Sequence, residues 1–328
     1  MSSVANVTIH ASQFPENVRR DLIVSLRERR VQHKFHYDSV KQTQKWLALH
    51  QLYSPSRNDS DCAATYYRGF AAAAARANSA PVHVIGLGCG GGQKDACLLK
   101  LLQAGGREVF YTPCDVSSAM VLVARQTALS VLPEQNCFPL VCDLATMDDL
   151  PAILNSHPAS GIPRLITFFG MIPNFEPESI LPKLAAVVRP QDDLLFSANL
   201  APGADYPSGV RRVLPQYDNP PTHDWLMTFL LDLGVERSDG ELRFAIESDP
   251  AGGDLKRIQA VFNFTRARRI QIESEAFTFG PGDTVRLFFS YRYTPALVCR
   301  LLMRHGLQVG GQWITRSEEE GVFLVRRG

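Results

Sequence analysis

Short apolar segments alternate with amphipathic segments along the middle of the chain. The apolar segments end at glycine, aspartate or another polar residue, which is typical of buried strands. We predict strands at 81–88, 109–114, 138–142, 164–170 and 194–198, with helices at 94–103, 119–132 and 177–188. Strands that alternate with helices pair in parallel through right-handed crossovers. The pattern therefore predicts an α/β fold with a doubly wound, Rossmann-like sheet.

The two ends of the chain and one internal stretch have other patterns. Residues 17–75 are helical in pattern with several breaks, whereas residues 203–275 combine proline-rich turns, a helix near 225–233 and strand-like alternation at 255–272. From residue 285 onwards the pattern is strand, helix and two strands, typical of the antiparallel edge that closes many such sheets.

These differences predict a core and a smaller α+β substrate-binding domain. The N-terminus and an insertion would form the smaller domain. The predicted parts are 1–60 (helical part of the substrate domain), 61–200 (cofactor-binding core), 201–284 (inserted substrate-binding region) and 285–328 (edge strands of the core).

Length and charge narrow the classes of protein. The chain has 328 residues, which suits a core of roughly 200 residues and a smaller domain. Its net charge is +1, and nucleic-acid partners usually require a basic surface. We therefore expect a small-molecule substrate and no nucleic acid. The sequence does not indicate an oligomeric state.

The termini and cysteines predict a cytoplasmic protein. Residues 1–20 contain no apolar signal region, and no apolar stretch is long enough to span a bilayer. The seven cysteines form no CxxC pair, which is typical of free thiols in a reducing compartment. No His/Cys cluster has metal-ligand spacing, so we expect no metal and no membrane partner.

A glycine cluster, Gly86-Leu87-Gly88-Cys89-Gly90-Gly91-Gly92, separates the first predicted strand from its helix. Glycines there let the backbone turn sharply beside a helix N-terminus and approach a ligand. A dinucleotide would fit this cluster alone equally well. However, Asp115 ends the second strand, where it can accept both ribose hydroxyls, and Asp143 ends the third, where it can bind an adenine amino group. We therefore predict S-adenosylmethionine as cofactor, with S-adenosylhomocysteine as product, bound by Gly86, Gly88, Gly90, Asp115 and Asp143.

Several further motifs occur in the order and spacing of one family. They are Phe35-His36-Tyr37-Asp38, Leu52-Tyr53-Ser54-Pro55-Ser56-Arg57-Asn58-Asp59, the glycine loop with Lys94, Asp115-Val116-Ser117, Phe168-Phe169-Gly170 to Asn174-Phe175, Gln216-Tyr217-Asp218 and Phe289-Ser290-Tyr291-Arg292-Tyr293. From about residue 20 to 327 the sequence resembles the histidine-specific methyltransferases of ergothioneine biosynthesis and their relatives that N-methylate a prenylated tryptophan in ergot alkaloid pathways.

The resemblance implies methylation of the amino nitrogen of a small amino acid or derivative, histidine-like or aromatic. Tyr37, Asn174, Tyr53 and Tyr217 match positions that hold the substrate's amino and carboxylate groups, and Ser290 matches one near its side chain. We predict that Tyr37 and Asn174 are catalytic because they aim the amine, whereas Tyr53 and Tyr217 bind the carboxylate. The predicted sets are completed by Lys94 for the cofactor and by Gly170, Phe288 and Ser290 for the substrate.

Three departures from the family pattern bear on specificity. Phe288 stands where the histidine enzymes have a glutamate, Ala260 where they have a methionine, and the Gly170–Asn174 segment is one residue shorter. A carboxylate facing an imidazole contributes roughly 1.5–3 kcal/mol, or about 10–150-fold in binding. A phenyl ring cannot replace it, so we predict a loss of histidine recognition in favour of an apolar or bulkier side chain.

Other functions fit parts of the sequence. A ring nitrogen or another non-α-amino group is an alternative methyl acceptor, and a non-enzymatic cofactor-binding protein is an alternative of another class. Asn219-Pro220-Pro221-Thr222 resembles a motif that holds planar amides or bases in other methyltransferases. That motif follows the fourth strand, whereas Asn219 lies in the insertion, so we predict a rigid turn before the next helix. No Lys, Tyr or His at a strand end suits a nicotinamide oxidoreductase.

Overall fold

The computed structural model describes residues 4–53, 58–77 and 81–328. It divides into two compact units, which are described separately. The first, here called the core unit, comprises Met1–Gln13, Pro55–Leu200 and Thr294–Gly328. The second unit comprises Phe14–Ser54 and Ala201–Tyr293.

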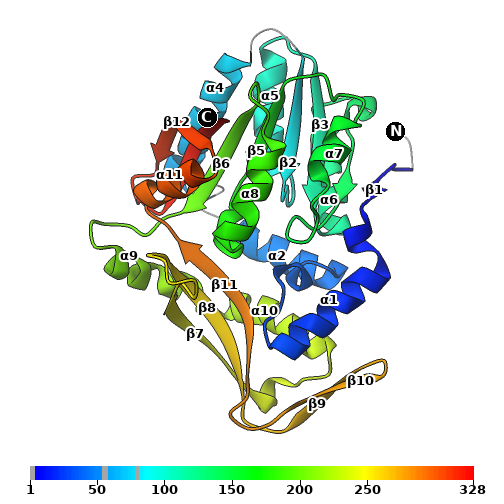
Figure 1. Cartoon of the computed structure of the whole chain (residues 1–328), viewed down its shortest axis with the longest axis vertical. Helices are drawn as coiled ribbons and strands as arrows, with labels where there is room; N and C mark the ends of the chain where they lie inside the picture. The colour runs from blue at the N-terminus through cyan, green and yellow to red at the C-terminus, as the bar shows by residue number, and fades with distance from the viewer. Residues whose placement is uncertain (1–3, 54–57, 78–80) are drawn as a thin grey trace. The chain divides into compact units, whose positions relative to one another are not determined.

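The core unit contains a sheet of eight strands in the order β1-β4-β3-β2-β5-β6-β13-β12 (Figure 1). Strands β1 to β6 pair in parallel, and β13 pairs antiparallel with both β6 and β12. The strands are β1 (Thr8–Ile9), β2 (Val82–Leu87), β3 (Val109–Asp115), β4 (Leu140–Val141), β5 (Arg164–Phe168), β6 (Asp193–Asn199), β12 (Leu307–Ile314) and β13 (Glu320–Arg327). This topology confirms the predicted doubly wound, Rossmann-like α/β fold.

The core unit contains the predicted helices and one more, α7 (Leu150–Asn155), which was not predicted. They are α4 (Ser60–Arg76), α5 (Gln93–Ala104), α6 (Ser118–Ala128), α7 (Leu150–Asn155), α8 (Pro177–Val187) and α11 (Pro295–Arg304). Helices α4, α5 and α6 contact one another in turn, and α8 contacts both α7 and α11. The Ser117 side chain caps α6 by accepting a hydrogen bond from Met120 N at 3.3 Å, which is the local reason that the chain turns into a helix after β3.

The second unit combines helices with two small sheets. Its helices are α1 (Pro15–Glu28), α2 (Val40–Tyr53), α9 (Tyr206–Val213) and α10 (Pro220–Asp232). One sheet has the order β11-β8-β7, and β9 and β10 form a separate hairpin that projects from it in Figure 1. These strands are β7 (Gly240–Ser248), β8 (Lys256–Phe264), β9 (Arg268–Ile272), β10 (Glu275–Phe279) and β11 (Thr284–Arg292).

The two units differ from the predicted parts in two places. Residues 4–13 lie in the core unit, where β1 pairs with β4, whereas the prediction placed them in the substrate domain. Strand β11 pairs with β8 in the second unit and is not an edge strand of the core. Hydrophobic alternation identifies a half-buried strand but does not identify its partner, and β1 is too short to show any periodicity.

The insertion also contains more strands than its pattern indicated. The alternating stretch at 255–272 is two strands, β8 and β9, and β7 and β10 flank it. Conversely, the strand predicted at 138–142 is reduced to the two residues of β4. In the described part of the chain, no helix is long and apolar enough to cross a membrane.

Two fully buried histidines are held in the neutral form. Burial lowers the pKa of His83 on β2 to about 3, with a further contribution from His157, whose ring stacks at 4.6 Å. Burial also lowers the pKa of His36 to about 4, although a hydrogen bond to the Leu287 carbonyl opposes the shift. The unfolded value is near 6.5, so protonation favours the unfolded chain.

We expect stability to fall as the pH falls below about 6.5. Between pH 6.5 and the lowered pKa values, the unfolded state binds more protons than the folded state. The stability that each neutral histidine contributes is therefore complete above pH 6.5 and is lost as the pH falls towards 3–4. Each histidine should lower the free energy of unfolding by about 1 kcal/mol between pH 7.5 and 5.5. Urea unfolding at both pH values measures this, and His83→Gln, which cannot titrate, should show a smaller difference. Equal pH dependence in the two proteins would contradict the assignment to His83.

Candidate cofactor site and acceptor cluster

Two glycines in the turn after β2 lie so close to neighbouring side chains that a Cβ would collide with them. A Cβ at Gly86 would lie 2.2 Å from the Asp95 carboxylate, so any side chain there would displace a buried charged group. Gly88 has φ +67°, and a Cβ there would lie 2.4 Å from Met171 Sδ. Both positions therefore require glycine, and they bring the backbone to the carboxyl end of β2, where open α/β sheets bind their ligands.

The Asp95 carboxylate lies beneath this turn, in the first turn of α5. Its Oδ2 accepts a hydrogen bond from the Tyr111 hydroxyl at 2.7 Å, and its Oδ1 accepts one from Thr167 Oγ1 at 2.8 Å. Burial raises the pKa of Asp95, while these two hydrogen bonds oppose the shift. Asp95 was not among the predicted site residues, although it directly follows Lys94.

Asp115, the last residue of β3, is fixed by backbone groups. Its Oδ2 accepts a hydrogen bond from Gly90 N, and its Oδ1 accepts one from Ser117 N, both at 3.0 Å. Burial raises the pKa of Asp115, and the hydrogen bonds from Ser117 and Gly90 oppose the shift. Val116 N–H also opposes the shift. A carboxylate offers about four lone-pair positions, so acceptor capacity remains for a hydroxyl donor of a ligand.

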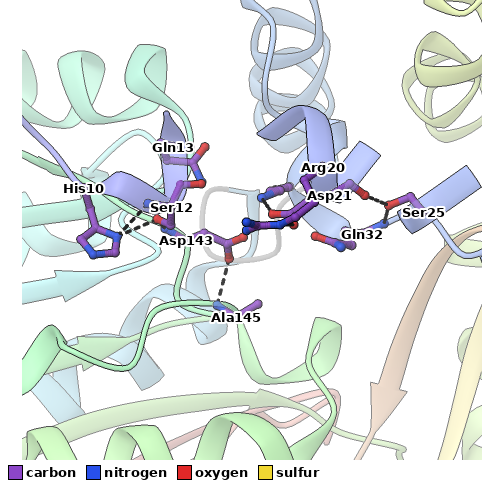
Figure 2. Close-up of polar contacts among 10 residues, drawn as sticks. His10, Ser12, Gln13, Arg20, Asp21, Ser25, Gln32, Asp143 and Ala145 are labelled. Carbon is purple, nitrogen blue, oxygen red and sulfur yellow. Dashed lines mark hydrogen bonds and ion pairs between the residues drawn. The ribbon is translucent and has the colours of Figure 1, made fainter. Parts of the chain in front are cut away.

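Asp143 follows β4 and is linked to the N-terminal segment (Figure 2). Its Oδ1 accepts a hydrogen bond from Ala145 N at 2.9 Å, and its backbone N–H donates to Ser12 Oγ at 3.0 Å. Ser12 in turn lies 2.9 Å from His10 Nδ1. The positions of Ser12 and His10 beside Asp143 could not be predicted from the sequence, because the parallel pairing of β1 with β4 brings them to this edge.

Lys94 on α5 belongs to a buried polar network. Its Nζ donates to the Tyr66 hydroxyl at 2.8 Å and lies 4.1 Å from the centre of the Tyr66 ring. The Tyr66 hydroxyl contacts Glu320 and lies 2.8 Å from Ser197 Oγ, which accepts a hydrogen bond from Gly170 N at 2.9 Å. The network connects Lys94 to the turn after β5. The contacts of Lys94 therefore support a role in positioning this turn.

The turn after β5 carries the other two predicted residues of the core unit. Gly170 has φ +68°, and Asn174 ends a short 3-10 helix over Ile172–Asn174. Glu176 is the N-cap residue of α8, so Asn174 does not cap that helix. The role of Asn174 in holding an amine stays a prediction from the resemblance.

In the second unit, Tyr37 and Phe288 lie in one cluster of aromatic rings, here called the acceptor cluster. The His33 ring lies 5.0 Å from Tyr37 and 5.8 Å from Phe288, and the Trp225 ring lies 5.6 Å and 5.9 Å from the same two rings. The Tyr37 hydroxyl lies 3.0 Å from His33 Nε2. Burial lowers the pKa of His33 to about 3, and His36 adds to the shift. The rings around Phe288 are therefore uncharged at neutral pH.

Tyr217 and Ser290 join the same cluster. The Tyr217 ring lies 6.1 Å from Phe288, and its hydroxyl lies 2.8 Å from Ser290 Oγ. Arg292, which is 4% exposed, donates to the Tyr217 hydroxyl at 2.8 Å. The structure thus brings together four of the five substrate residues predicted on the second unit. No role was predicted for His33, Trp225 or Arg292. Arg292 lies within a quoted motif, His33 lies two residues before one, and Trp225 lies in the helix that follows the Tyr217 motif.

The remaining predicted positions have different surroundings. Tyr53 is the last residue of α2 and is 55% exposed, whereas residues 54–57 of its motif lie outside the described part of the chain. Ala260 on β8 is fully buried and pairs directly with Phe288 on β11. The two departures from the family pattern therefore face each other across one pair of strands.

The Asn219-Pro220-Pro221 segment begins a helix. Asn219 caps α10 by accepting hydrogen bonds from Thr222 N and Oγ1, both at 3.0 Å, and its amide nitrogen donates to the Gln216 carbonyl at 2.8 Å. The Asn219 side-chain amide is thus hydrogen-bonded to neighbouring residues, and the prolines occupy the first helical turn. Among the described residues, no group of three or more His, Cys, Asp or Glu side chains is arranged to hold a metal ion.

A doubly wound sheet with a glycine turn after β2 and carboxylates after β3 and β4 defines a nucleotide-type cofactor site of the methyltransferase class. The chain belongs to the histidine-specific, S-adenosylmethionine-dependent methyltransferase family, whose sequence model matches residues 18–233. The enzyme class and the cofactor that the sequence predicted are thereby confirmed.

Individual relatives are more distant. The N-methyltransferase fsqC of Aspergillus fumigatus is 23% identical over 251 residues, which span 75% of this chain and 66% of that protein, slightly under two thirds of its length. Among solved structures, the CcbJ methyltransferase from Streptomyces caelestis is 13% identical, with 80% of this chain and 89% of that chain covered and a TM-score of 0.41. The 1,6-didemethyltoxoflavin-N1-methyltransferase of Burkholderia thailandensis is 12% identical, with 88% of each chain covered and a TM-score of 0.40.

We expect Asp115→Asn to weaken the binding of S-adenosylhomocysteine by about 10–150-fold. The amide keeps the shape but removes the charge from the hydrogen bonds to a ligand's hydroxyls, at a cost of roughly 1.5–3 kcal/mol. Calorimetric titration measures the affinity. Asp148→Asn is the matched control, because Asp148 is a largely exposed aspartate after β4. An Asp115→Asn protein that binds as tightly as the control would remove Asp115 from the cofactor site.

Proposed function

We propose that the protein methylates the amino nitrogen of a small amino acid or amino-acid derivative with an aromatic or apolar side chain. The observation that carries the proposal is the acceptor cluster, in which Tyr37, Tyr217, Phe288 and Ser290 come together although they lie far apart in the sequence. Family membership supports amino-acid substrates, and the Aspergillus fumigatus relative, named as an N-methyltransferase, supports nitrogen as the acceptor atom.

The core unit would hold the cofactor at the carboxyl end of its parallel strands. Glycine at positions 86 and 88 lets the backbone turn past Asp95 and Met171 at this edge, and Asp115 is held in place by Gly90 N and Ser117 N. Asp115 would accept the ribose hydroxyls and Asp143 the adenine amino group. When bound, S-adenosylmethionine supplies an electrophilic methyl group on a sulfonium, so the chain itself needs no nucleophilic residue.

The acceptor nitrogen must have a free lone pair that points in line with the methyl group. Even in peptides an α-amino group titrates only at about 7.7–8.0, and the site must therefore favour the neutral form of the substrate's amine. His33 is neutral at this pH because of its burial, and its unprotonated Nε2 can accept the Tyr37 hydroxyl proton at 3.0 Å. The phenol oxygen then accepts an N–H of the amine and aims the lone pair. Such positioning can supply several kcal/mol of the barrier.

Specificity for an aromatic or apolar side chain follows from Phe288 and Ala260. By the resemblance, a phenylalanine and an alanine that face each other stand where the histidine enzymes have a glutamate and a methionine. The exchange removes a charge and moves side-chain volume from β8 to β11. An imidazole would lose its charged hydrogen-bond partner, whereas a flat apolar ring can stack on the rings of Phe288 and Trp225.

A panel of free amino acids tests the acceptor class. We expect the protein saturated with S-adenosylhomocysteine to bind tryptophan or another aromatic amino acid at least 10-fold more tightly than histidine in calorimetric titrations. Phe288→Glu should improve the relative affinity for histidine, and Phe288→Leu is the uncharged control. Tight binding of histidine by the natural protein would overturn the proposed specificity. If no amino acid binds, a modified amino acid or a ring nitrogen becomes the leading acceptor.

We expect Tyr37→Phe to reduce kcat at least 10-fold and to leave the affinity for S-adenosylhomocysteine unchanged. The phenyl ring keeps the packing against His33 and Trp225 but cannot accept an N–H from the amine. Methyl transfer from labelled cofactor measures kcat, and Tyr67→Phe on the exposed surface of α4 is the control. Unchanged turnover would show that Tyr37 takes no part in the reaction.

The enzyme is proposed to act in the cytoplasm. All seven cysteines are free thiols in the structure, and free thiols persist in reducing compartments.

A further inference from the structure

The chain that follows β1 leaves the edge of the core sheet beside Asp143. Thr8 N and His10 N donate to two carbonyls of the β4 segment, at 3.0 and 2.9 Å, as in a regular parallel ladder. The chain then turns into a 3-10 helix over Ala11–Gln13, in which the His10 carbonyl accepts a hydrogen bond from Gln13 N at 2.9 Å. The carbonyl that would continue the ladder is therefore used inside the turn.

The Ser12 side chain takes the place of that carbonyl. Its Oγ accepts the hydrogen bond from Asp143 N at 3.0 Å (Figure 2). Asp143 is only 5% exposed, and a buried backbone N–H requires an acceptor. Ser12 thus ends the ladder between β1 and β4 with a side chain, and it holds the backbone from which the Asp143 carboxylate projects.

His10 orients the Ser12 hydroxyl. Ser12 N donates to His10 Nδ1 at 3.1 Å, so Nδ1 is the unprotonated nitrogen of the imidazole ring. The Ser12 hydroxyl lies 2.9 Å from the same nitrogen and donates to it. The lone pairs of Ser12 Oγ are then left for Asp143 N. The other ring nitrogen, Nε2, carries the proton and lies 3.1 Å from Asp149 Oδ1, which favours this tautomer.

Two further hydrogen bonds shape the turn after Asp143. Its Oδ1 accepts from Ala145 N at 2.9 Å, and its carbonyl accepts from Met147 N at 3.0 Å. Both donors belong to the same turn, so these bonds fix the shape of the turn. The bond to Ser12 comes from another segment, so it fixes the place of the turn at the sheet edge. A hydrogen bond from a ligand requires about 2.7–3.2 Å, and a small shift of the carboxylate would lose it.

We propose that Ser12 and His10 are positioning residues that determine which purine the cofactor site accepts, and that they act through Asp143. The inference rests on the assignment of Asp143 to the adenine amino group in the proposed function. A carboxylate favours a purine with an amino group at position 6, because a 6-oxo group is an acceptor and has no proton to donate. Selection for the amino group therefore depends on the position that Ser12 gives to Asp143.

Two ligands that differ at this one purine position test the inference on the full-length protein. They are S-adenosylhomocysteine, with the 6-amino group, and S-inosylhomocysteine, with the 6-oxo group. In calorimetric titrations we expect the natural protein to bind the adenosyl compound about 10-fold or more tightly than the inosyl compound. Ser12→Ala should lower the affinity for the adenosyl compound about 5–10-fold and change that for the inosyl compound less than about 2-fold. His10→Phe should show a smaller loss of the same kind, and it provides the same test if Ser12→Ala does not fold.

Two further variants distinguish positioning from a general effect on the fold. Ser12→Thr keeps the hydroxyl and should restore the preference for the adenosyl compound. Ser130→Ala removes an exposed hydroxyl that donates to a carbonyl of α6 at 2.8 Å, and it should change neither affinity. A Ser12→Ala protein that loses affinity for both compounds equally would overturn the inference.

Asp143→Asn separates this inference from the assignment on which it rests. An amide can donate to a 6-oxo group, so we expect this variant to lose the preference for the adenosyl compound. If Asp143→Asn loses the preference but Ser12→Ala keeps it, only the positioning role of Ser12 is wrong. If the natural protein shows no preference, or if Asp143→Asn keeps it, the adenine assignment is wrong and the inference is overturned with it. If all the expected preferences are found but no amino acid is methylated, the proposed acceptor is wrong and this inference stands.

Discussion

The carboxylate of Asp95 is the constraint on which the core unit depends. It is 3% exposed, and each of its oxygens accepts a hydrogen bond from a neighbouring strand, Tyr111 on β3 and Thr167 on β5. Between them lies Gly86 on β2, which leaves room for the carboxylate because it has no Cβ. A buried charge is tolerated only when its partners are in place. One side chain of α5 therefore requires a particular register of three parallel strands, and the same register places Gly88, Asp115 and the turn after β5 at one edge.

In the second unit, by contrast, two histidine side chains are held in the uncharged form. Its histidines at positions 33 and 36 are neutral because burial outweighs every favourable contact of their charged forms. The Phe288 ring can then pack against His33, and the Trp225 ring against His36, without burying a charged imidazolium. The rings around Phe288 are therefore uncharged, and the charged Arg292 guanidinium lies beside Tyr217. Under the proposed function, a matching ligand has one flat apolar part and one hydrogen-bonding end.

The parts that the sequence predicted well are those that local chemistry controls. Strand and helix alternation from residue 81 to 198 follows hydrophobic period and caps such as Ser117, and the turn glycines and strand-end acids follow from that order. Pairing between distant segments was not predictable in the same way. The partner of β11, the addition of β1 to the sheet and the contact of Ser12 with Asp143 all depend on tertiary context. Arg292 lies in a quoted motif but received no role, because one arginine in an alternating strand does not show its partner, and the structure supplies its contact with Tyr217.

The exchange of a carboxylate for Phe288 has an effect on selectivity beyond the loss of one attraction. A site that hydrogen-bonds a substrate group rejects analogues without that group by factors of about 10⁴–10⁵, whereas an apolar pocket separates similar side chains by only about 10–200-fold. A phenyl ring at position 288 therefore makes side-chain recognition more permissive. In the proposed function, strong discrimination is then left to the polar contacts of the substrate's amino and carboxylate groups, which the resemblance assigns to Tyr37 and Tyr217. Under the proposed function, an enzyme built this way accepts several aromatic side chains but requires an intact amino-acid backbone.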